Sequence, residues 1–135
     1  MDAATRRLVR RRARDTCEYC RLKQEHEPFL TFHVEHIIAK QHGGGDDHSN
    51  LCLACSSCNL HKGPNIAGVD PQSGALTPLF NPRNAVWSQH FEWRGSLLFG
   101  KTATGRATVA VLGINLPENV EQRDTLRDEG VFPPG

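Results

Sequence analysis

The chain has 135 residues and a formal net charge of +1, so its overall charge gives no long-range attraction to nucleic acid. A hydrophobic content of 38% argues against a disordered chain. No apolar run approaches the roughly 20 residues of a membrane helix, and no apolar stretch follows the charged start. We therefore expect one cytoplasmic domain, residues 1–135, with no membrane partner and no secretory signal.

Basic residues cluster near the start of the chain. Residues from about 4 to 15 contain no Gly or Pro and predict a short basic helix. Arg6, Arg10 and Arg14 follow an i, i+4 spacing that would place them in one stripe. The stripe suits contacts with DNA phosphates, although a solvated helix face that happens to be rich in arginine explains it equally well.

Four of the five cysteines form two pairs with two-residue gaps, Cys17 with Cys20 and Cys55 with Cys58. Such a gap lets a tight turn present two thiolates to one Zn²⁺, so the pairs together predict a Cys₄ structural site. An odd cysteine count without a secretory context makes disulfides the poorer explanation. Cys52 is an alternative partner for Cys55, but it alternates with leucines in an expected strand, where a buried free thiol is the ordinary interpretation.

The segment between the cysteine pairs predicts a strand, a loop, a second strand and a helix, in that order. Residues 29–38 are rich in Phe, Thr, Val and Ile, as strands are, and the glycines of residues 41–48 predict a loop. A short strand is expected over residues 51–54 and a helix over residues 56–62. This region, about residues 17–63, is the expected core.

Residues 64–130 are expected to form an extension of that core. Residues 64–82 contain several Gly and Pro residues and predict an irregular arm, with Leu76, Leu79 and Phe80 packing back on the body. The next elements are expected to be a hairpin over residues 90–100 that turns at Gly95-Ser96, either a helix capped by Thr104 or a strand over residues 104–114, and a helix over residues 117–129.

The central segment holds the residue types that phosphodiester cleavage needs. Cleavage requires a base for the attacking water, charge relief on the phosphate and help for the departing oxygen. A histidine near its ordinary pKa can accept the proton of the water at neutral pH. A carboxylate and an amide oxygen suit Mg²⁺ or Mn²⁺ and leave coordination positions open for the phosphate.

These residues resemble the HNH, or ββα-metal, endonucleases. The matching parts are Glu35-His36 at the end of the first strand, the loop from Gly43 to Asp47, Asn50-Leu51 at the second strand, and Cys58-Asn59-Leu60-His61-Lys62-Gly63 on the helix. The resemblance covers about residues 17–63. It implies an α+β fold in which a ββα-metal core is stapled by the Cys₄ zinc site, preceded by the basic helix and followed by the hairpin and a final helix.

The resemblance also implies the roles of four residues. His36 would be the general base, and Asn50 would orient its imidazole by accepting a hydrogen bond from the other ring nitrogen. Glu35 and Asn59 would hold the catalytic metal. Asn59 stands where most of the family has histidine, which makes this an HNN-type site and favours Mg²⁺ or Mn²⁺, because an amide oxygen is a harder ligand than imidazole.

Two neighbouring side chains remain open to interpretation. Adjacent strand residues point to opposite faces, so Glu35 and His36 can reach one site only if the strand ends or bulges there. His33 shares a face with Glu35, and it is either a second ligand or supporting group or an ordinary half-buried strand histidine. Lys62 is expected to contact a DNA phosphate.

The sequence thus predicts a divalent-metal-dependent endonuclease that acts on double-stranded DNA and leaves 5′-phosphate and 3′-hydroxyl ends. The alternative is a non-catalytic zinc-ribbon module that binds nucleic acid on a nuclease-like scaffold. A purely structural or interaction protein is a third, weaker hypothesis. Neither the DNA sequence recognised nor any protein partner follows from the residues.

Overall fold

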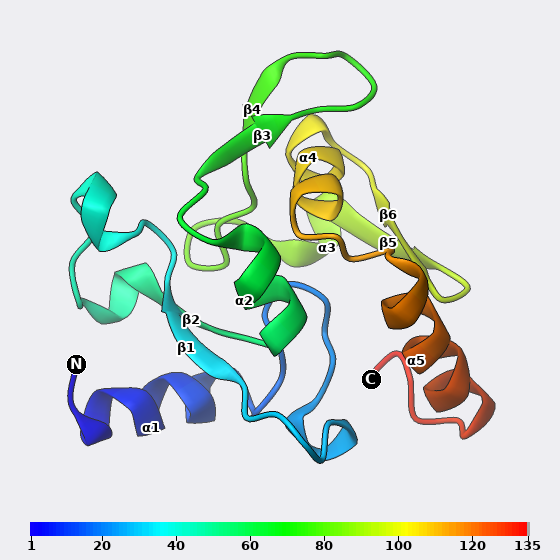
Figure 1. The fold of residues 1–135 in the computed structure, drawn as a ribbon, viewed down its shortest axis with the longest axis horizontal. Coiled ribbons are helices and arrows are strands. Elements are labelled where there is room, and N and C mark those ends of the chain that lie inside the picture. Colours follow the sequence, from blue (N-terminus) through cyan, green and yellow to red (C-terminus); the bar gives the residue numbers. More distant parts are fainter. Residues whose placement is uncertain (135) are drawn as a thin grey trace.

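A computed structural model describes residues 1–134 and shows helices alternating with three small antiparallel sheets (Figure 1). Each sheet has two strands. The helices are α1 (Ala3–Arg12), α2 (Ser56–Lys62), α3 (Trp87–His90), α4 (Ala103–Val111) and α5 (Pro117–Asp128). The strands are β1 (His33–His36), β2 (Leu51–Ala54), β3 (Ala67–Val69), β4 (Leu76–Pro78), β5 (Phe91–Arg94) and β6 (Leu97–Gly100). The expected α+β class is confirmed.

The centre of the molecule is a ββα unit made of β1, β2 and α2. β1 pairs antiparallel with β2, so that Glu35 lies opposite Cys52 and His36 opposite Leu51. β2 is buried along its whole length, which explains its unbroken apolar sequence. β2 and α2 have the bounds that the sequence predicts, whereas β1 begins only at His33, four residues later than expected.

Helix α1 lies against this unit and is held by two arginines. The Val9 side chain on the inner face of α1 is fully buried. The Arg12 guanidinium donates hydrogen bonds to the carbonyl oxygens of His48 (3.1 Å) and Leu51 (2.7 Å). Arg10 donates to the carbonyl oxygen of Phe32 at 2.7 Å. The first helix therefore fixes the start of β2 and the chain that leads into β1.

Two hairpins of the C-terminal extension pack on α4. The β3–β4 hairpin lies within the segment expected to be irregular, because its short strands are surrounded by the Gly and Pro residues that predict loops. Leu79 and Phe80 are buried as expected, but Leu76 is 76% exposed, so its predicted packing is wrong. The β5–β6 hairpin is confirmed. Residues 103–111 form a helix, which Thr102 rather than Thr104 caps.

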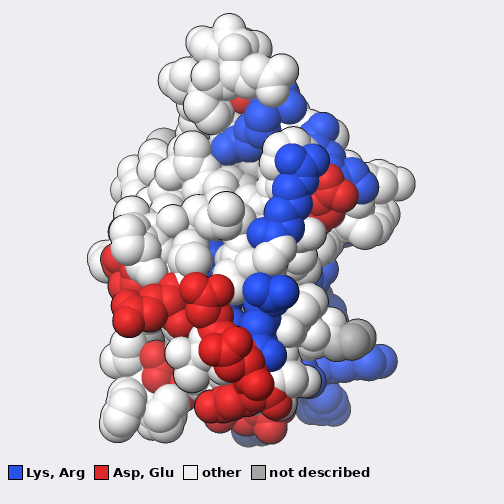
Figure 2. All heavy atoms as spheres, turned by 90° about the vertical axis from the view of Figure 1, so that its right-hand side faces the viewer, with Lys and Arg blue, Asp and Glu red and all other residues white. Residues whose placement is uncertain are grey.

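The last helix, α5, forms part of an outer face with a divided charge. Figure 2 shows acidic side chains gathered over one area of this face and basic side chains in a separate line. The exposed acids of α5 are Glu118, Glu121, Asp124 and Asp128. A concentration of carboxylates repels a phosphate backbone, so this area is unsuited to DNA. None of the described helices is both long and apolar enough to cross a membrane.

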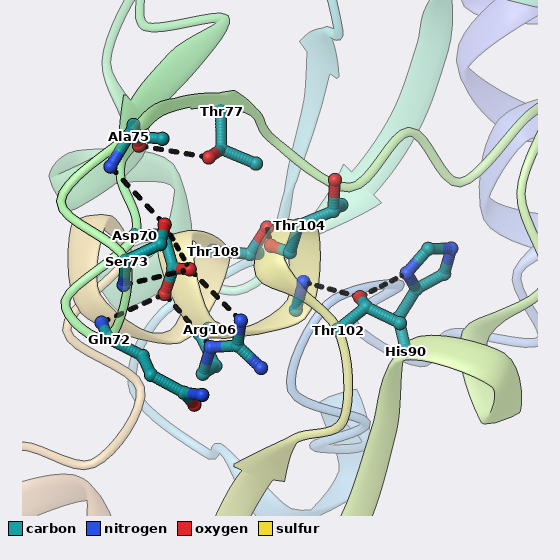
Figure 3. Close-up of polar contacts among 11 residues, drawn as sticks. Asp70, Gln72, Ser73, Ala75, Thr77, His90, Thr102, Thr104, Arg106 and Thr108 are labelled. Atoms are coloured by element: carbon teal, nitrogen blue, oxygen red, sulfur yellow. Dashed lines mark hydrogen bonds and ion pairs between the residues drawn. The ribbon is translucent and has the colours of Figure 1, made fainter.

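A saturated ion pair ties the β3–β4 turn to α4 (Figure 3). The Asp70 side chain is fully buried and receives two hydrogen bonds of 2.9 Å from the Arg106 guanidinium. The backbone N–H groups of Gln72 and Ser73 and the Ser73 hydroxyl donate to the same carboxylate. The Arg106 hydrogen bonds hold the pKa of Asp70 well below its ordinary value.

The extension also contacts the turn that carries Cys17 and Cys20. The Trp87 indole N–H donates to the carbonyl oxygen of Tyr19 at 2.8 Å. The Arg21 guanidinium lies over the Trp87 ring, 4.9 Å from its centroid. Arg83 forms an ion pair with Glu18. Segments far apart in the sequence therefore meet at the first cysteine pair.

Candidate functional site

The four paired cysteines converge on one point. The sulfur atoms of Cys17, Cys20, Cys55 and Cys58 are buried and lie within 4.8 Å of one another. The backbone N–H of Cys20 points to Cys17 Sγ (3.5 Å), and that of Cys58 points to Cys55 Sγ (3.4 Å). These contacts are formed within the tight turns that the two-residue gaps predict. Cys52 is fully buried outside the cluster, as expected.

This cluster fits a zinc ion. Cys20 Sγ and Cys55 Sγ are 3.7 Å apart, far beyond a covalent sulfur–sulfur bond. With Zn–S bonds of about 2.3 Å, the edge of a tetrahedron of sulfurs is roughly 3.8 Å. The cluster joins the turn before β1 to the start of α2, so a bound zinc would fix the helix that carries Asn59.

An open pocket of about 500 Å³ lies between β1 and α2 and brings together three of the predicted site residues. Glu35 and His36 line it from β1, and Asn59 lines it from α2. β1 ends at His36, which is how two consecutive strand residues come to line one pocket. His33 also lines the pocket and is exposed, so its interpretation as a half-buried strand histidine is wrong.

Glu35 is a buried carboxylate with few strong partners. It is 7% exposed, and the Cys52 thiol lies 3.5 Å from its Oε1. Burial raises the pKa of Glu35 to about 7, although the nearby Lys62 ammonium and Tyr19 hydroxyl oppose the shift. The Asn59 side chain makes no hydrogen bond to any described residue. A carboxylate and a free amide oxygen that line one pocket suit an Mg²⁺ or Mn²⁺ ion.

His36 has a partner that the sequence did not predict. Its Nε2 lies 2.6 Å from Oδ1 of Asp46, a residue of the glycine-rich loop between β1 and β2. The His36 hydrogen bond lowers the pKa of Asp46 to about 2. Asp46 is therefore ionised at neutral pH.

Asn50 does not contact His36 directly, which corrects its predicted role. Its Oδ1 accepts a hydrogen bond from the N–H of Ile38 at 2.9 Å. Its Nδ2 donates to the carbonyl oxygens of Ile38 (3.0 Å) and Gly45 (2.9 Å). The amide closes the loop, and its oxygen accepts from the backbone rather than from the imidazole.

The prediction that Lys62 contacts DNA is wrong. Its side chain is only 1% exposed, and Nζ donates to the carbonyl oxygen of Ile37 at 2.9 Å. Because α2 packs on β1, the Lys62 side chain points inward, although Leu60 and His61 in the same turn are exposed. Lys62 thus places a buried positive charge near Glu35 instead of near a phosphate.

Comparison with known proteins agrees with this geometry. A family model described as HNH endonuclease matches residues 17–65. The chain contains an HNH domain. The match begins at the first zinc-type cysteine and ends just after α2, so it covers the ββα unit, the cysteine cluster and the pocket. No curated protein and no solved structure matches the chain.

The predicted arginine stripe lies outside the HNH domain and is not a stripe. α1 ends at Arg12, and Arg14 follows in a left-handed turn with φ of 54°. Arg6 and Arg10 are one turn apart on α1, but Arg10 is half-buried and donates to the carbonyl oxygen of Phe32. Arg6 and Arg14 are exposed, and Arg14 does not continue the row because it lies beyond the helix.

Sequence reasoning missed several residues that support the HNH domain. Asp46 contacts His36, Arg12 contacts the start of β2, and Tyr19 lies beside Glu35. Asp46 had one available signal, because it directly follows three glycines in a loop beside the predicted base. Arg12 and Tyr19 had none, since their partners are distant in the sequence.

Proposed function

We propose that this protein is a divalent-metal-dependent endonuclease that hydrolyses phosphodiester bonds of double-stranded DNA. The observation that supports the proposal is the shared pocket of Glu35, His36 and Asn59 inside an HNH domain. We also propose that residues 1–135 act as one domain and that the protein works in the cytoplasm, where reduced thiols bind zinc.

The pocket residues would divide the chemistry between them. His36 would accept the proton of the attacking water, and Glu35 and Asn59 would hold Mg²⁺ or Mn²⁺. Such an ion supplies charge stabilisation for the phosphate and for the departing 3′ oxygen. This course of reaction leaves a 5′-phosphate and a 3′-hydroxyl.

DNA binding would depend on exposed arginines of the N-terminal region rather than on Lys62. Arg6, Arg7 and Arg11 of α1 are exposed, as is Arg14 after it. If these side chains neutralise phosphates, affinity falls steeply as salt is raised.

Cleavage of a supercoiled plasmid tests the proposal. With zinc-loaded protein and added Mg²⁺ or Mn²⁺, we expect His36→Ala to cut about 100-fold more slowly than wild type or worse, the range for loss of a general base. His42→Ala is the matched control, because His42 is exposed in the segment that follows β1 and does not line the pocket. Equal cutting by wild type and His36→Ala would exclude the mechanism. DNA binding without any cutting by wild type would favour the zinc-ribbon alternative.

A further inference from the structure

We propose that Asp46 is a positioning residue for His36, holding the imidazole through Nε2 so that Nδ1 is the nitrogen that accepts the proton of the attacking water. The inference rests on the proposed role of His36 as general base. It assigns a role to a residue of the glycine-rich loop that the family match and the sequence motifs left without one.

The contact between the two side chains determines where the ring proton sits. Nε2 of His36 is 2.6 Å from Oδ1 of Asp46, a short, charge-assisted distance. An ionised carboxylate can only accept hydrogen bonds, so Nε2 must carry the proton and donate it. In the neutral imidazole the lone pair is then on Nδ1, and the second nitrogen of His36 is available as a base.

The glycine-rich loop brings Asp46 to this position. Asn50 binds the carbonyl oxygen of Gly45, the residue immediately before Asp46, and also binds both backbone groups of Ile38. Gly44 fits beneath them, where a Cβ would lie 1.7 Å from the carbonyl oxygen of Ile38. Asn50 therefore acts on His36 at one remove, through the backbone that carries Asp46.

A lysine shares the Asp46 carboxylate with His36. Lys40 Nζ is 3.5 Å from Oδ1, and its positive charge favours the ionised form of the carboxylate. The Asp46 side chain is nevertheless 41% exposed. Its replacement should therefore cost little folding free energy, which allows an effect on His36 to be separated from an effect on stability.

Kinetics of Asp46 variants provide the first test. With saturating Mg²⁺, we expect Asp46→Ala to lower kcat by about 10- to 100-fold, as loss of a group behind a catalytic histidine does, with little change in KM. Asp46→Asn should be intermediate, because its amide oxygen can still accept from Nε2 without the charge. Asp47→Asn is the matched control: this neighbouring carboxylate makes no side-chain hydrogen bond to any described residue, and its variant should retain wild-type kcat.

Ring ¹⁵N spectra of His36 provide a second test that needs no activity. With His36→Ala used to assign its signals, the neutral ring should carry its proton on Nε2 in wild type and in Asp47→Asn. In Asp46→Ala we expect a mixture of both tautomers. An unchanged tautomer in Asp46→Ala, or an unchanged kcat where His36→Ala is inactive, would overturn the inference alone. Full activity of His36→Ala would instead overturn the proposed function.

Discussion

The molecule contains two buried carboxylates, Asp70 and Glu35, that differ in how completely they are hydrogen-bonded. Asp70 in the extension is enclosed by the Arg106 guanidinium, two backbone N–H groups and a hydroxyl. Glu35 in the HNH domain is similarly buried but has a thiol at 3.5 Å, and Asn59 across the pocket has no side-chain partner among the described residues.

This difference is the one expected between a carboxylate that stabilises the fold and one that is kept for a ligand. A buried carboxylate that has all its hydrogen bonds stabilises the fold and has nothing left to offer a ligand. A buried carboxylate without them costs stability, and it is retained where a ligand completes its bonding. Burial does not distinguish Asp70 from Glu35, whereas their hydrogen-bond partners do.

The largest expected effect comes from removing zinc from the cysteine cluster. A strong zinc chelator should unfold the HNH domain, because binding of a structural zinc supplies on the order of 10 kcal/mol to folding. Circular dichroism would show the loss, and one equivalent of zinc should restore the signal. Cys20→Ser should behave like the chelated protein, whereas Cys52→Ala should keep its zinc. A native spectrum after complete zinc removal would contradict the structural role of the cluster.

Glu35→Gln should change activity and stability in opposite directions. It should abolish plasmid cleavage by weakening metal binding. Without added Mg²⁺, it should also make the zinc-loaded protein more stable at pH 8, by up to about 3 kcal/mol. The direction of the stability change follows from the raised pKa of Glu35. Between pH 4.5 and about pH 7, Glu35 is deprotonated in the unfolded chain but still protonated in the folded one. Wild-type stability therefore falls as pH rises through this range.

Urea denaturation at several pH values measures this second effect. The gap between Glu35→Gln and wild type should be present at pH 8 and absent below pH 4.5, where Glu35 is protonated in both states. A variant less stable than wild type at pH 8 would show that the buried carboxylate is satisfied after all, and the contrast with Asp70 would be lost.

Asp70→Asn should have the smallest effect, confined to stability. It should lower the melting temperature without changing cleavage, because the Arg106 pair lies outside the HNH domain. The pKa of Asp70 is depressed, so the ionised carboxylate contributes to folding stability above pH 3.8. That contribution is lost as pH falls below this value. The difference from wild type should therefore narrow there in urea titrations. Asp128→Asn, an exposed carboxylate on α5, is the control, and reduced cleavage by Asp70→Asn alone would contradict the division.

The sequence was most informative where spacing alone determines structure. The cysteine pairs predicted their cluster, and the apolar run 51–54 and the segment 56–62 predicted β2 and α2 with their observed bounds. The turn within each cysteine pair, β2 and α2 all depend on neighbours within a few residues. The β5–β6 hairpin was predictable for the same reason, since its turn residues lie between two apolar runs.

The sequence was misleading where packing decides which way a side chain points. Lys62 at the end of a short helix is ordinarily solvated, and only the packing of α2 on β1 turns it inward. The Asn50 motif indicated a role in the site, but whether its amide meets an imidazole or the backbone depends on how the loop closes. The partner of His36 depends on that same closure.

The contact between Trp87 and the first cysteine turn gives the protein an optical property. Both of its tryptophans, Trp87 and Trp93, lie in the extension, and the Trp87 indole is bonded to the carbonyl oxygen of Tyr19, between Cys17 and Cys20. Intrinsic tryptophan fluorescence therefore originates outside the HNH domain, yet one emitter is attached to the turn of the first cysteine pair. Zinc loading of the cysteine cluster should therefore change the emission of the unlabelled protein.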